Sequence, residues 1–312
     1  MPEIGIIIVT YNSAAVIGSC LEAACATGAA IVVVDNASTD ATLTVVKRHP
    51  VQVVANPANC GFAAAVNQGF AALNTAYVLL LNPDTVLASS LDPLREACDL
   101  PRAGGASGRL LDHEGNPQIG FMVRELPTAM ALILEILLLN RLWPGNPINV
   151  KYRCKRWDYS ALQPAGQPAA AFLMIRRAVW QELGGFDERF WPLWFEDVDF
   201  CRRAADRGYL FYYQPQAVAF HTGAHSIPSL SLEMRRVYWY GSLLRYSAKH
   251  FRPRGVRAIC LAVVTGSCLR IFLESALQRS LKPMAVYSKV VRLAGRFLFG
   301  RGDNATASVL DH

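Results

Sequence analysis

The fold is decided by residues 4–40, which read IGIIIVTYNSAAVIGSCLEAACATGAAIVVVDNASTD. Two apolar runs rich in β-branched residues, 4–10 and 31–35, lie on either side of a stretch with helical composition, 14–24. Continuous apolar runs of this length predict strands that are buried on both faces of a parallel sheet. The order strand, helix, strand therefore predicts a right-handed β-α-β unit.

The same alternation continues along the first hundred residues. Strands are predicted over 51–55 and 77–81, and helices over 40–48 and 62–73. This pattern favours an α/β fold with a Rossmann-like, doubly wound and mostly parallel sheet.

Beyond residue 100 the pattern is looser. Residues 144–167 are rich in Pro, Gly, Asn and Arg and predict a long loop, whereas residues 114–124 have too little periodicity for a prediction. From Leu230 onwards the sequence predicts helices. The remaining elements are strands over 103–111, 169–175 and 209–213, and helices over 128–143 and 200–207.

Positive charge is concentrated near the C-terminus. The whole chain has a net charge of +7, but residues 235–312 hold 14 Lys and Arg against 3 Asp and Glu, a net charge of +11. A basic tail indicates an anionic partner, either nucleic acid or acidic lipid. The apolar runs 259–264 and 269–273 favour lipid, because an arm that binds nucleic acid has no need of them. We therefore expect an anionic membrane surface as a partner and no nucleic acid; the alternative is a helical subdomain that closes the core or forms a homodimer.

The sequence predicts a protein that lies on a membrane without crossing it. The two longest apolar stretches, 130–139 and 258–269, are shorter than the roughly 20 residues that span a bilayer. The first residues lack the basic segment typical of a signal peptide. The eight cysteines form no Cys-x-x-Cys pair and predict buried free thiols in a reducing compartment. We expect a cytoplasmic protein, peripheral at the inner face of the cell membrane.

Polar side chains follow the predicted strands at one edge of the sheet, where ligands of such folds bind. Asn and Asp also cap helices and form turns, but Asp35 and Asp84 stand at the tips of apolar strands, where we favour a binding role. The sequence has neither a G-x-G-x-x-G after the first strand nor a P-loop, so the phosphates of a nucleotide need another counter-charge, most simply a divalent cation on Asp84. The polar segments are Thr10-Tyr11-Asn12, Asp35-Asn36, Asn56 and Asn82-Pro83-Asp84.

A second group of candidate residues combines carboxylates with bulky aromatic side chains. It comprises GGFDERF at 184–190 and WFEDVD at 194–199. Apolar surroundings raise carboxylate pKa values and suit a general base. The alternative is a helix whose first turn holds Glu196, Asp197 and Asp199 close to the positive end of its dipole. We favour catalysis, because so many aromatic residues have no purpose at a solvated helix start.

Seven segments, in this order and spacing, resemble the inverting family 2 glycosyltransferases of the GT-A fold, most closely a rhamnosyltransferase-like branch. Each segment alone is a weak signal, but together they are specific, and the resemblance extends from about Ile4 to Ser226. It implies a GT-A domain in which 1–100 binds the nucleotide sugar and 101–229 binds the acceptor and carries the catalytic groups, followed by a basic, apolar, mainly helical extension at 230–312. The segments are IIIVTYNS, VVVDNASTD, NCGFAAAVNQG, LLLNPDT, AFLMIRR, GGFDERF and FEDVDFCRRA.

The resemblance also implies roles for individual residues. Asp197 would be the catalytic base, with Glu196 beside it in the active site. Asp84 stands where the family has its D-x-D metal motif and would bind Mg²⁺ or Mn²⁺, and His221 would meet this metal or the diphosphate. The donor-binding residues would be Thr10, Tyr11, Asn12, Asp35, Asn59, Gly61, Asn67 and Asn82.

The chain departs from the family pattern at two places. Asn82 replaces the first acid of D-x-D, which leaves one fewer negative charge on the metal. Ala170-Ala171 stands where the family has Gly-Ala, which implies a tighter turn on the acceptor side.

The implied function is that of an inverting, metal-dependent glycosyltransferase. It would move a sugar, by resemblance rhamnose, from a nucleotide diphosphate sugar to a glycan or lipid-linked acceptor in cell-envelope polysaccharide synthesis. A sugar-nucleotide pyrophosphorylase is disfavoured, because residues 10–18 contain no Lys or Arg to bind phosphates. The remaining alternative is a catalytically silent, membrane-docked protein that binds nucleotide or glycan. Intact acids at Asp84, Glu196 and Asp197 argue against it.

Overall fold

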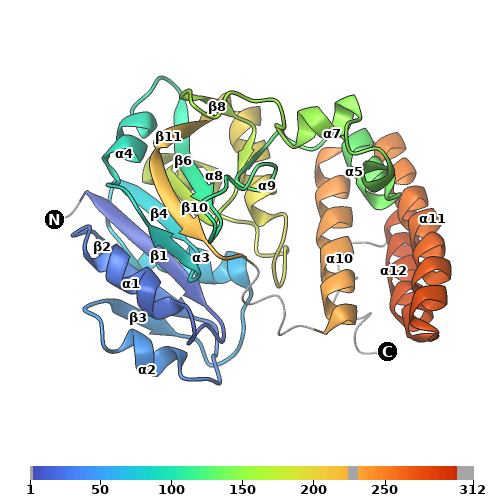
Figure 1. Ribbon diagram of the computed structural model, residues 1–312, viewed down its shortest axis with the longest axis horizontal. Helices are drawn as coiled ribbons and strands as arrows, with labels where there is room; N and C mark the ends of the chain where they lie inside the picture. Colours follow the sequence, from blue (N-terminus) through green and yellow to red (C-terminus); the bar gives the residue numbers. More distant parts are fainter. Residues whose placement is uncertain (1–2, 224–230, 301–312) are drawn as a thin grey trace. The chain divides into compact units, whose positions relative to one another are not determined.

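A computed structural model describes residues 3–223 and 231–300 of the chain. The chain divides into two compact units, each of which is described by itself (Figure 1). The first unit comprises residues 1–126, 153–192 and 196–228, and the second comprises 127–152, 193–195 and 229–312.

The first unit is built on one mixed sheet, in which nine strands are described. At one side of it, β3 (Gln52–Ala55), β2 (Ala30–Asp35), β1 (Ile4–Thr10) and β4 (Tyr77–Leu81) pair in parallel. β10 (Phe172–Arg176) then enters antiparallel between β4 and β6 (Ala103–Leu111). The sheet continues with β11 (Leu210–His221), parallel to β6, and with β5 (Thr85–Leu87) and β8 (Gln163–Ala165), both antiparallel to β11.

Helices cover both faces of this sheet, as a doubly wound fold requires. Successive side chains of a strand point to opposite faces, so Ile6 and Ile8 enter one core while Ile7 enters the other. The first core is closed by α1 (Ile17–Cys25), α2 (Thr42–Val46) and α4 (Asp92–Cys98). The second is closed by α3 (Phe62–Ala72), α8 (Arg177–Leu183) and α9 (Glu196–Asp206). The predicted α/β fold with a mostly parallel, Rossmann-like sheet is confirmed.

The elements predicted for the first hundred residues lie where the sequence places them, with helix ends shifted by a few residues. The predicted strand over 169–175 begins only at Phe172, and the strand predicted over 209–213 continues to His221 as β11, with a shift of register between Gln214 and Val218. The segment 114–124, for which the sequence gives no prediction, ends in β7 (Val123–Arg124), which pairs with β9 (Gln167–Pro168).

The predicted single helix over 128–143 is wrong, and a contact from far along the chain explains why. The segment forms α5 (Ala129–Ile136) and α6 (Leu139–Leu142), interrupted at Leu138, whose φ is 62°. The guanidinium of Arg270 donates a hydrogen bond to the main-chain oxygen of Ile136 at 2.6 Å. At the break, the carbonyl of Ile136 loses its helical N–H donor. The Arg270 guanidinium replaces this donor, so the carbonyl keeps a hydrogen bond.

The predicted loop over 144–167 is also more ordered than its composition suggests. It contains α7 (Pro147–Tyr152) and the strand β8. Asn146 stands before this helix, and its side-chain oxygen accepts a hydrogen bond from the main-chain nitrogen of Asn149 at 2.8 Å. An Asn in this position is a strong helix N-cap, and Pro147 occupies the first turn, where its missing N–H does no harm.

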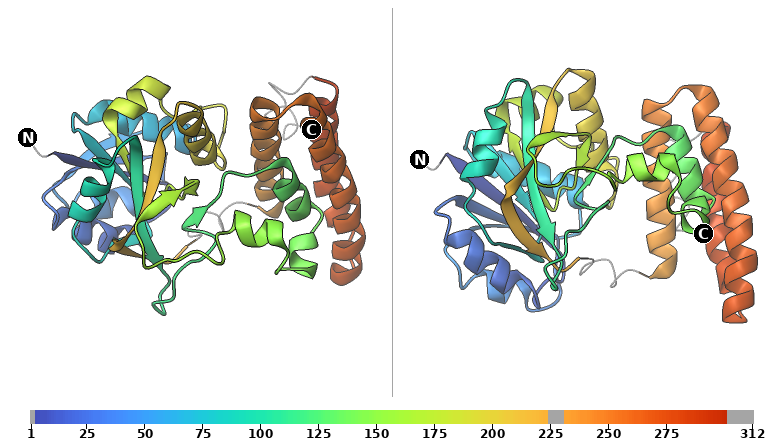
Figure 2. Two further views of the ribbon diagram at one scale, coloured as in Figure 1. Left: turned by 90° about the horizontal axis from the view of Figure 1, so that it is seen from above. Right: turned by 45° about the horizontal axis from the view of Figure 1, so that its top comes forward.

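The second unit is helical and is completed by α10 (Leu232–His250), α11 (Pro253–Gln278) and α12 (Lys282–Leu298), which lie side by side (Figure 2). In the described residues α11 is long and apolar enough to cross a membrane, with a mean hydropathy of 1.9 in its most apolar window. The expectation that no stretch reaches this length is therefore wrong: the helix extends beyond 258–269 at both ends. Length and composition alone fit both a membrane span and a helix of a bundle, and 39% of that window is buried inside the protein.

All eight cysteines are free, and five of them are buried. The prediction of buried thiols fails at Cys268, which is exposed on α11.

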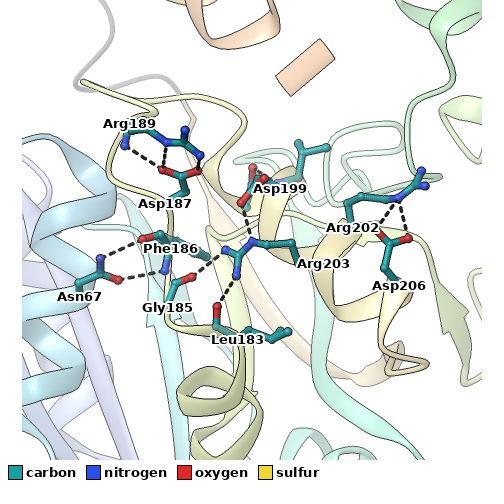
Figure 3. A network of polar contacts seen from close by, with 12 residues as sticks. Asn67, Leu183, Gly185, Phe186, Asp187, Arg189, Asp199, Arg202, Arg203 and Asp206 are labelled. Carbon is teal, nitrogen blue, oxygen red and sulfur yellow. Dashed lines mark hydrogen bonds and ion pairs between the residues drawn. The ribbon is translucent and has the colours of Figure 1, made fainter. Parts of the chain in front are cut away.

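A buried ion pair holds the segment that leads into α9 (Figure 3). Arg203 donates to Asp199, one helical turn earlier, at 2.8 Å, and its other two nitrogens donate to the main-chain oxygens of Leu183 and Gly185 at 2.6 and 2.7 Å. Asp199 is fully buried, and the Arg203 side chain is one-fifth exposed. The guanidinium thus ties the end of α8 to the helix that carries the predicted catalytic acids.

Replacing Arg203 with Met should lower the free energy of unfolding by about 3 kcal/mol or more, because it removes a charged partner from a carboxylate that has no contact with water. The matched control is Arg202→Met, which breaks an i,i+4 pair with Asp206 on the exposed side of the same helix. This control should cost less than about 1 kcal/mol. Urea unfolding of the two variants measures the difference, and equal losses would contradict a structural role for Arg203.

Candidate active site

The carboxyl ends of β1 and β2 carry a compact cluster of polar side chains. Thr10 and Asp35 are partners in the parallel register, and the Thr10 hydroxyl donates to the Asp35 carboxylate at 2.8 Å. Ser38 donates to the same carboxylate through its main-chain nitrogen and its hydroxyl, at 2.9 and 2.6 Å. Thr10 and Asp35 are buried, so they organise this loop from within, whereas Tyr11 and Asn12 are half-buried and reach its surface.

Asn12 fixes the neighbouring turn. Its φ is 50°, a left-handed conformation that Asn tolerates better than most residues. Its main-chain nitrogen donates to the Ser38 hydroxyl, and its side-chain oxygen accepts from the main-chain nitrogen of Thr39, both at 2.8 Å. The predicted donor-binding residues Thr10, Tyr11, Asn12 and Asp35 are therefore brought together.

Asn59 and Gly61 shape the start of α3. The Asn59 side chain accepts a hydrogen bond from the main-chain nitrogen of Gly61 at 2.9 Å. Gly61 has a φ of 88°, and a Cβ there would lie 2.7 Å from the Trp191 side chain and 3.2 Å from the oxygen of Pro192. Only glycine allows this close approach of the 191–192 segment.

Asn67, also on α3, binds the loop that precedes α9 and is fully engaged there. Its side chain exchanges two hydrogen bonds with the main chain of Phe186, both at 3.0 Å (Figure 3). It also donates a hydrogen bond to Glu188 at 2.8 Å. The structure therefore gives Asn67 a positioning contact, whereas the sequence suggests a donor-binding one. No contact in the structure tests that second role.

Asp84 and His221 face each other at the edge of the sheet. Asp84 follows the Asn82-Pro83 turn at the end of β4, and the antiparallel pairing of β5 with β11 places Thr85 opposite His221. The His221 Nε2 and Asp84 Oδ1 atoms lie 3.5 Å apart, and both side chains are at most 5% exposed. The register of β5 thus joins two residues that are 137 positions apart in the sequence.

Gln118 fixes the proton on the His221 ring. Its Nε2 donates to the main-chain oxygen of His221 at 2.6 Å, which leaves its Oε1 to face His221 Nδ1 at 2.9 Å. Because Oε1 can only accept, Nδ1 carries the proton and Nε2 presents a lone pair toward Asp84. Burial lowers the pKa of His221, although the Asp84 charge opposes this, so the neutral ring is favoured. Phe121 stacks on the ring with centroids 5.0 Å apart.

This pair has the chemistry of a cation site. A carboxylate oxygen and an imidazole lone pair are both electron-pair donors, and they gain by facing each other only across a cation. Two ligands that each stand about 2.1 Å from one ion lie about 3.0 to 3.5 Å from each other. Among residues 3–223 and 231–300 no group of three or more His, Cys, Asp or Glu side chains could hold a metal ion.

The acids between residues 187 and 199 differ in their ion-pair and hydrogen-bond partners. Asp187 is paired with Arg189 at 2.7 Å, Glu188 accepts from Asn67, and Asp199 is paired with Arg203. The remaining two, Glu196 and Asp197, make no ion pair within the described residues.

Asp197 is the less buried member of this pair. Its side chain is half-buried and accepts from Val198 N at 2.8 Å, Gln167 Nε2 at 3.2 Å and Ala170 N at 3.4 Å. Burial raises the pKa of Asp197, and the two main-chain donors partly oppose this. These donors hold an ionised carboxylate whose basicity is greater than that of an exposed aspartate.

Glu196 has the opposite environment. It is 6% exposed, and its Oε2 has no hydrogen-bond partner in the described part of the chain. Burial, followed by the charge of Asp197, raises the pKa of Glu196 well above its ordinary value. Two neighbouring buried carboxyl groups do not both ionise readily, so the proton resides on Glu196 and the charge on Asp197.

The two centres are linked through Ala170 and Ala171. Ala170 donates to Asp197, and the oxygen of Ala171 accepts from the main-chain nitrogen of Asn82 at 3.1 Å. Asp84, with its partner His221, and Asp197 are therefore both tied to the junction of β4 and β10. The sequence predicts Asp84, His221, Glu196 and Asp197 but misses Gln118, Gln167 and Phe121, since the first and last lie in the segment without periodicity.

The chain is similar in sequence to known glycosyltransferases. The profile of Glycosyl transferase family 2 matches residues 5–160. Two relatives, from Mycobacterium tuberculosis strains CDC 1551 / Oshkosh and ATCC 25618 / H37Rv, are both named N-acetylglucosaminyl-diphospho-decaprenol L-rhamnosyltransferase. Each is 32% identical over 211 residues, which is 63% of this chain and 67% of theirs.

Solved structures share the fold at low sequence identity. The mannosyltransferase PcManGT from Pyrobaculum calidifontis, in complex with GDP-Man and Mn²⁺, has a TM-score of 0.51 at 18% identity, over 96% of this chain and 86% of that chain. S. aureus TarS 1–349 in complex with UDP-GlcNAc has a TM-score of 0.53 at 15% identity, over 100% and 91%. GalNAc-T7 with UDP, GalNAc and Mn²⁺ has 0.55 at 14%, over 79% and 48%.

The predicted GT-A fold and family resemblance are thus confirmed by a profile that covers half of the chain and by relatives matched over two thirds of their length. With a sheet edge that carries the expected acids, the chain belongs to glycosyl transferase family 2 and is a glycosyltransferase.

Proposed function

We propose that this enzyme moves a sugar, with inversion, from a nucleotide diphosphate sugar to a lipid-linked glycan in cell-envelope polysaccharide synthesis, and that the sugar is rhamnose. The observation that carries the reaction type is the junction of β4 and β10, where Asn82, two residues before Asp84 of the Asp84–His221 pair, is bonded to Ala171 and Asp197 is bonded to Ala170. The name of the mycobacterial relatives supports the sugar and the class of acceptor.

In this proposal residues 1–100 bind the nucleotide sugar, and residues 101–229 supply the acceptor site and the base. Asp84 and His221 would hold Mg²⁺ or Mn²⁺, which supplies charge neutralisation at the departing diphosphate. The half-buried Tyr11 and Asn12 would line the nucleoside site, and the buried Asp35 would fix their loop.

Asp197 takes a proton from the acceptor hydroxyl in the proposed reaction. The oxygen then attacks the anomeric carbon from the face opposite the diphosphate, and the bond to the diphosphate breaks in the same displacement. Configuration at the anomeric carbon inverts, and no covalent glycosyl-enzyme forms. Glu196 stays protonated beside the base, so that its own charge does not oppose the approach of a polar acceptor.

We also propose that the enzyme works in the cytoplasm at the inner face of the cell membrane, where a lipid-linked acceptor is embedded. The basic C-terminal region, with a net charge of +11 over residues 235–312, supports attraction to an anionic surface.

Asp84→Ala should remove the metal-dependent part of donor binding. In the unmodified protein, a nucleoside diphosphate with Mg²⁺ or Mn²⁺ should raise the melting temperature more than the nucleotide alone, by mass action on the folded state. The control is Asp206→Ala, which removes an exposed carboxylate remote from the site and should keep the full shift. A metal-dependent shift that survives in Asp84→Ala would place the cation elsewhere.

Asp197→Asn should lower the transfer rate by about 10²-fold or more, because it keeps the shape of the side chain and removes the base. Glu196→Gln should be much milder, since the amide resembles the protonated acid that already occupies this position. Transfer of a radiolabelled sugar to a short-chain lipid-linked acceptor measures both, with the donor-induced melting shift as a check on binding. The reverse ranking would make Glu196 the base, and absence of transfer by the unmodified protein would favour a silent binding protein.

The pH dependence of kcat/KM should report the environment of Asp197. The ionised form is the active one, so the rate falls as pH falls through the pKa of this group. Because burial raises that pKa above the 3.8 of an isolated aspartate, the acid limb should lie at higher pH than 3.8. In Glu196→Gln the limb should stay in place. A limb that moves to lower pH in this variant would show that Glu196 is ionised in the working enzyme.

A further inference from the structure

Exposed apolar side chains are concentrated in the second unit. Fourteen of the nineteen exposed large apolar residues in the described part of the chain belong to it, although it is the smaller unit. Single exposed apolar residues are ordinary, but a contiguous group marks an interaction surface.

The group is continuous along one face of α11 and the turn after it. On this face Phe272 is 73% exposed, and at the end of the helix and in the turn after it Leu277 and Leu281 are 84% and 76% exposed. The face carries no charge between Arg257 and Arg279, a distance of about 33 Å along the helix. Its large apolar residues are Leu261, Leu269 and Phe272; Leu273 lies at its edge, and Leu277 and Leu281 continue the apolar surface at the end of the helix and in the turn after it.

The two charged residues within this span point away from Leu261 and Phe272. Arg270 is 7% exposed and donates to the oxygen of Ile136 on α5. Glu274 accepts from the Tyr287 hydroxyl on α12 at 2.8 Å and lies 3.8 Å from Arg236 on α10. Polar contacts to all three neighbouring helices therefore hold one side of α11 in the bundle.

The close fit of α11 against α5 rests on Gly266. A Cβ at this position would lie 2.7 Å from the oxygen of Ile136, so the helices approach to backbone contact there. Pulling α11 out of the bundle as a lone membrane span would strip Arg270 and Glu274 of these partners inside lipid, which is costly. Only the exposed face is available to a partner.

Basic residues close both ends of the apolar face. Arg254 and Arg257 precede it, and Arg279 and Lys282 follow it. A second copy of this chain would bring these positive ends together in either orientation of the two helices. Anionic lipid offers the complementary charge, and long basic side chains at the ends of an apolar stripe reach back to phosphate groups. The charges thus favour a lipid surface over self-association.

We propose that this face of α11, together with the turn into α12, is a membrane-contact surface that lies in the plane of an anionic bilayer while the opposite face stays in the helical bundle. Only the purpose of this surface, which is to hold the enzyme beside a lipid-linked acceptor, rests on the proposed function. The surface itself is defined by exposure, charge and the contacts of α11.

The test is co-sedimentation of the full chain with vesicles of phosphatidylcholine, with and without phosphatidylglycerol, at low salt. Phe272→Gln/Leu277→Gln should weaken binding to the anionic vesicles by about tenfold or more, since it removes two apolar side chains from the interface without changing the charge. The matched pair of single variants is Leu277→Gln and Leu162→Gln, the second being an exposed leucine of the first unit. Leu277→Gln should lose affinity and Leu162→Gln should not.

A second pair of substitutions separates charge from insertion. Arg279→Gln/Lys282→Gln should remove the preference for phosphatidylglycerol and leave binding to pure phosphatidylcholine unchanged. The proposal is overturned if the unmodified protein ignores anionic vesicles, or if Phe272→Gln/Leu277→Gln binds them normally. It is also overturned if the unmodified protein dimerises without lipid and that variant is monomeric, because the face then serves a second copy.

Donor binding distinguishes this proposal from the proposed function. The donor-induced melting shift, measured without lipid, should be the same in all these variants and the unmodified protein. Vesicle binding that follows the expected pattern while no nucleotide sugar binds would retain the surface and refute the glycosyl transfer. Donor binding without vesicle binding would refute the membrane-contact surface and retain the proposed glycosyl transfer.

Discussion

Phe172 pairs with Leu81 where β10 enters the sheet antiparallel beside β4. Because the strands run in opposite directions, the end of β4 and the start of β10 lie at the same edge. Asn82 continues from one and Ala171 precedes the other, and a main-chain hydrogen bond joins them. The Asp84 turn depends on this junction, and so does the main-chain nitrogen of Ala170 that holds Asp197. A mostly parallel sheet in which β10 is reversed between β4 and β6 therefore gathers its acids at a single edge.

Differences in burial give these acids different roles. Around α9, Asp199 is neutralised by Arg203 and serves the fold, Glu196 is deprived of water and keeps its proton, and Asp197 retains three donors and partial exposure. On an exposed surface these three acids would have similar protonation states and similar roles. What separates them is the depth of each side chain and the number of N–H groups that point at it.

Sequence reasoning succeeds where local pattern and tertiary structure agree. β1, β2 and β4 are continuous apolar runs buried on both faces, so their bounds and the polar residues at their ends follow directly from the sequence. The break at Leu138 could not be predicted, because its compensation comes from Arg270, 134 residues away from Ile136. Gln118 was missed for a similar reason: its segment has no periodicity, and its role exists only through the contact with His221. The apolar character of α11 is visible in the sequence only as the short runs 259–264 and 269–273, because Thr265-Gly266-Ser267-Cys268 separates them.

The fixed ring of His221 has a consequence for the choice of metal. Mg²⁺ prefers oxygen ligands throughout, whereas Mn²⁺ and the later divalent ions accept imidazole nitrogen more readily. A site with one carboxylate oxygen and one imidazole nitrogen, and with Asn82 in place of a second acid, offers magnesium less than a pair of acids would. In the proposed cation site, the three-residue edge strand β5 places His221 opposite Thr85, and the imidazole nitrogen would make the site more suitable for Mn²⁺ than for Mg²⁺.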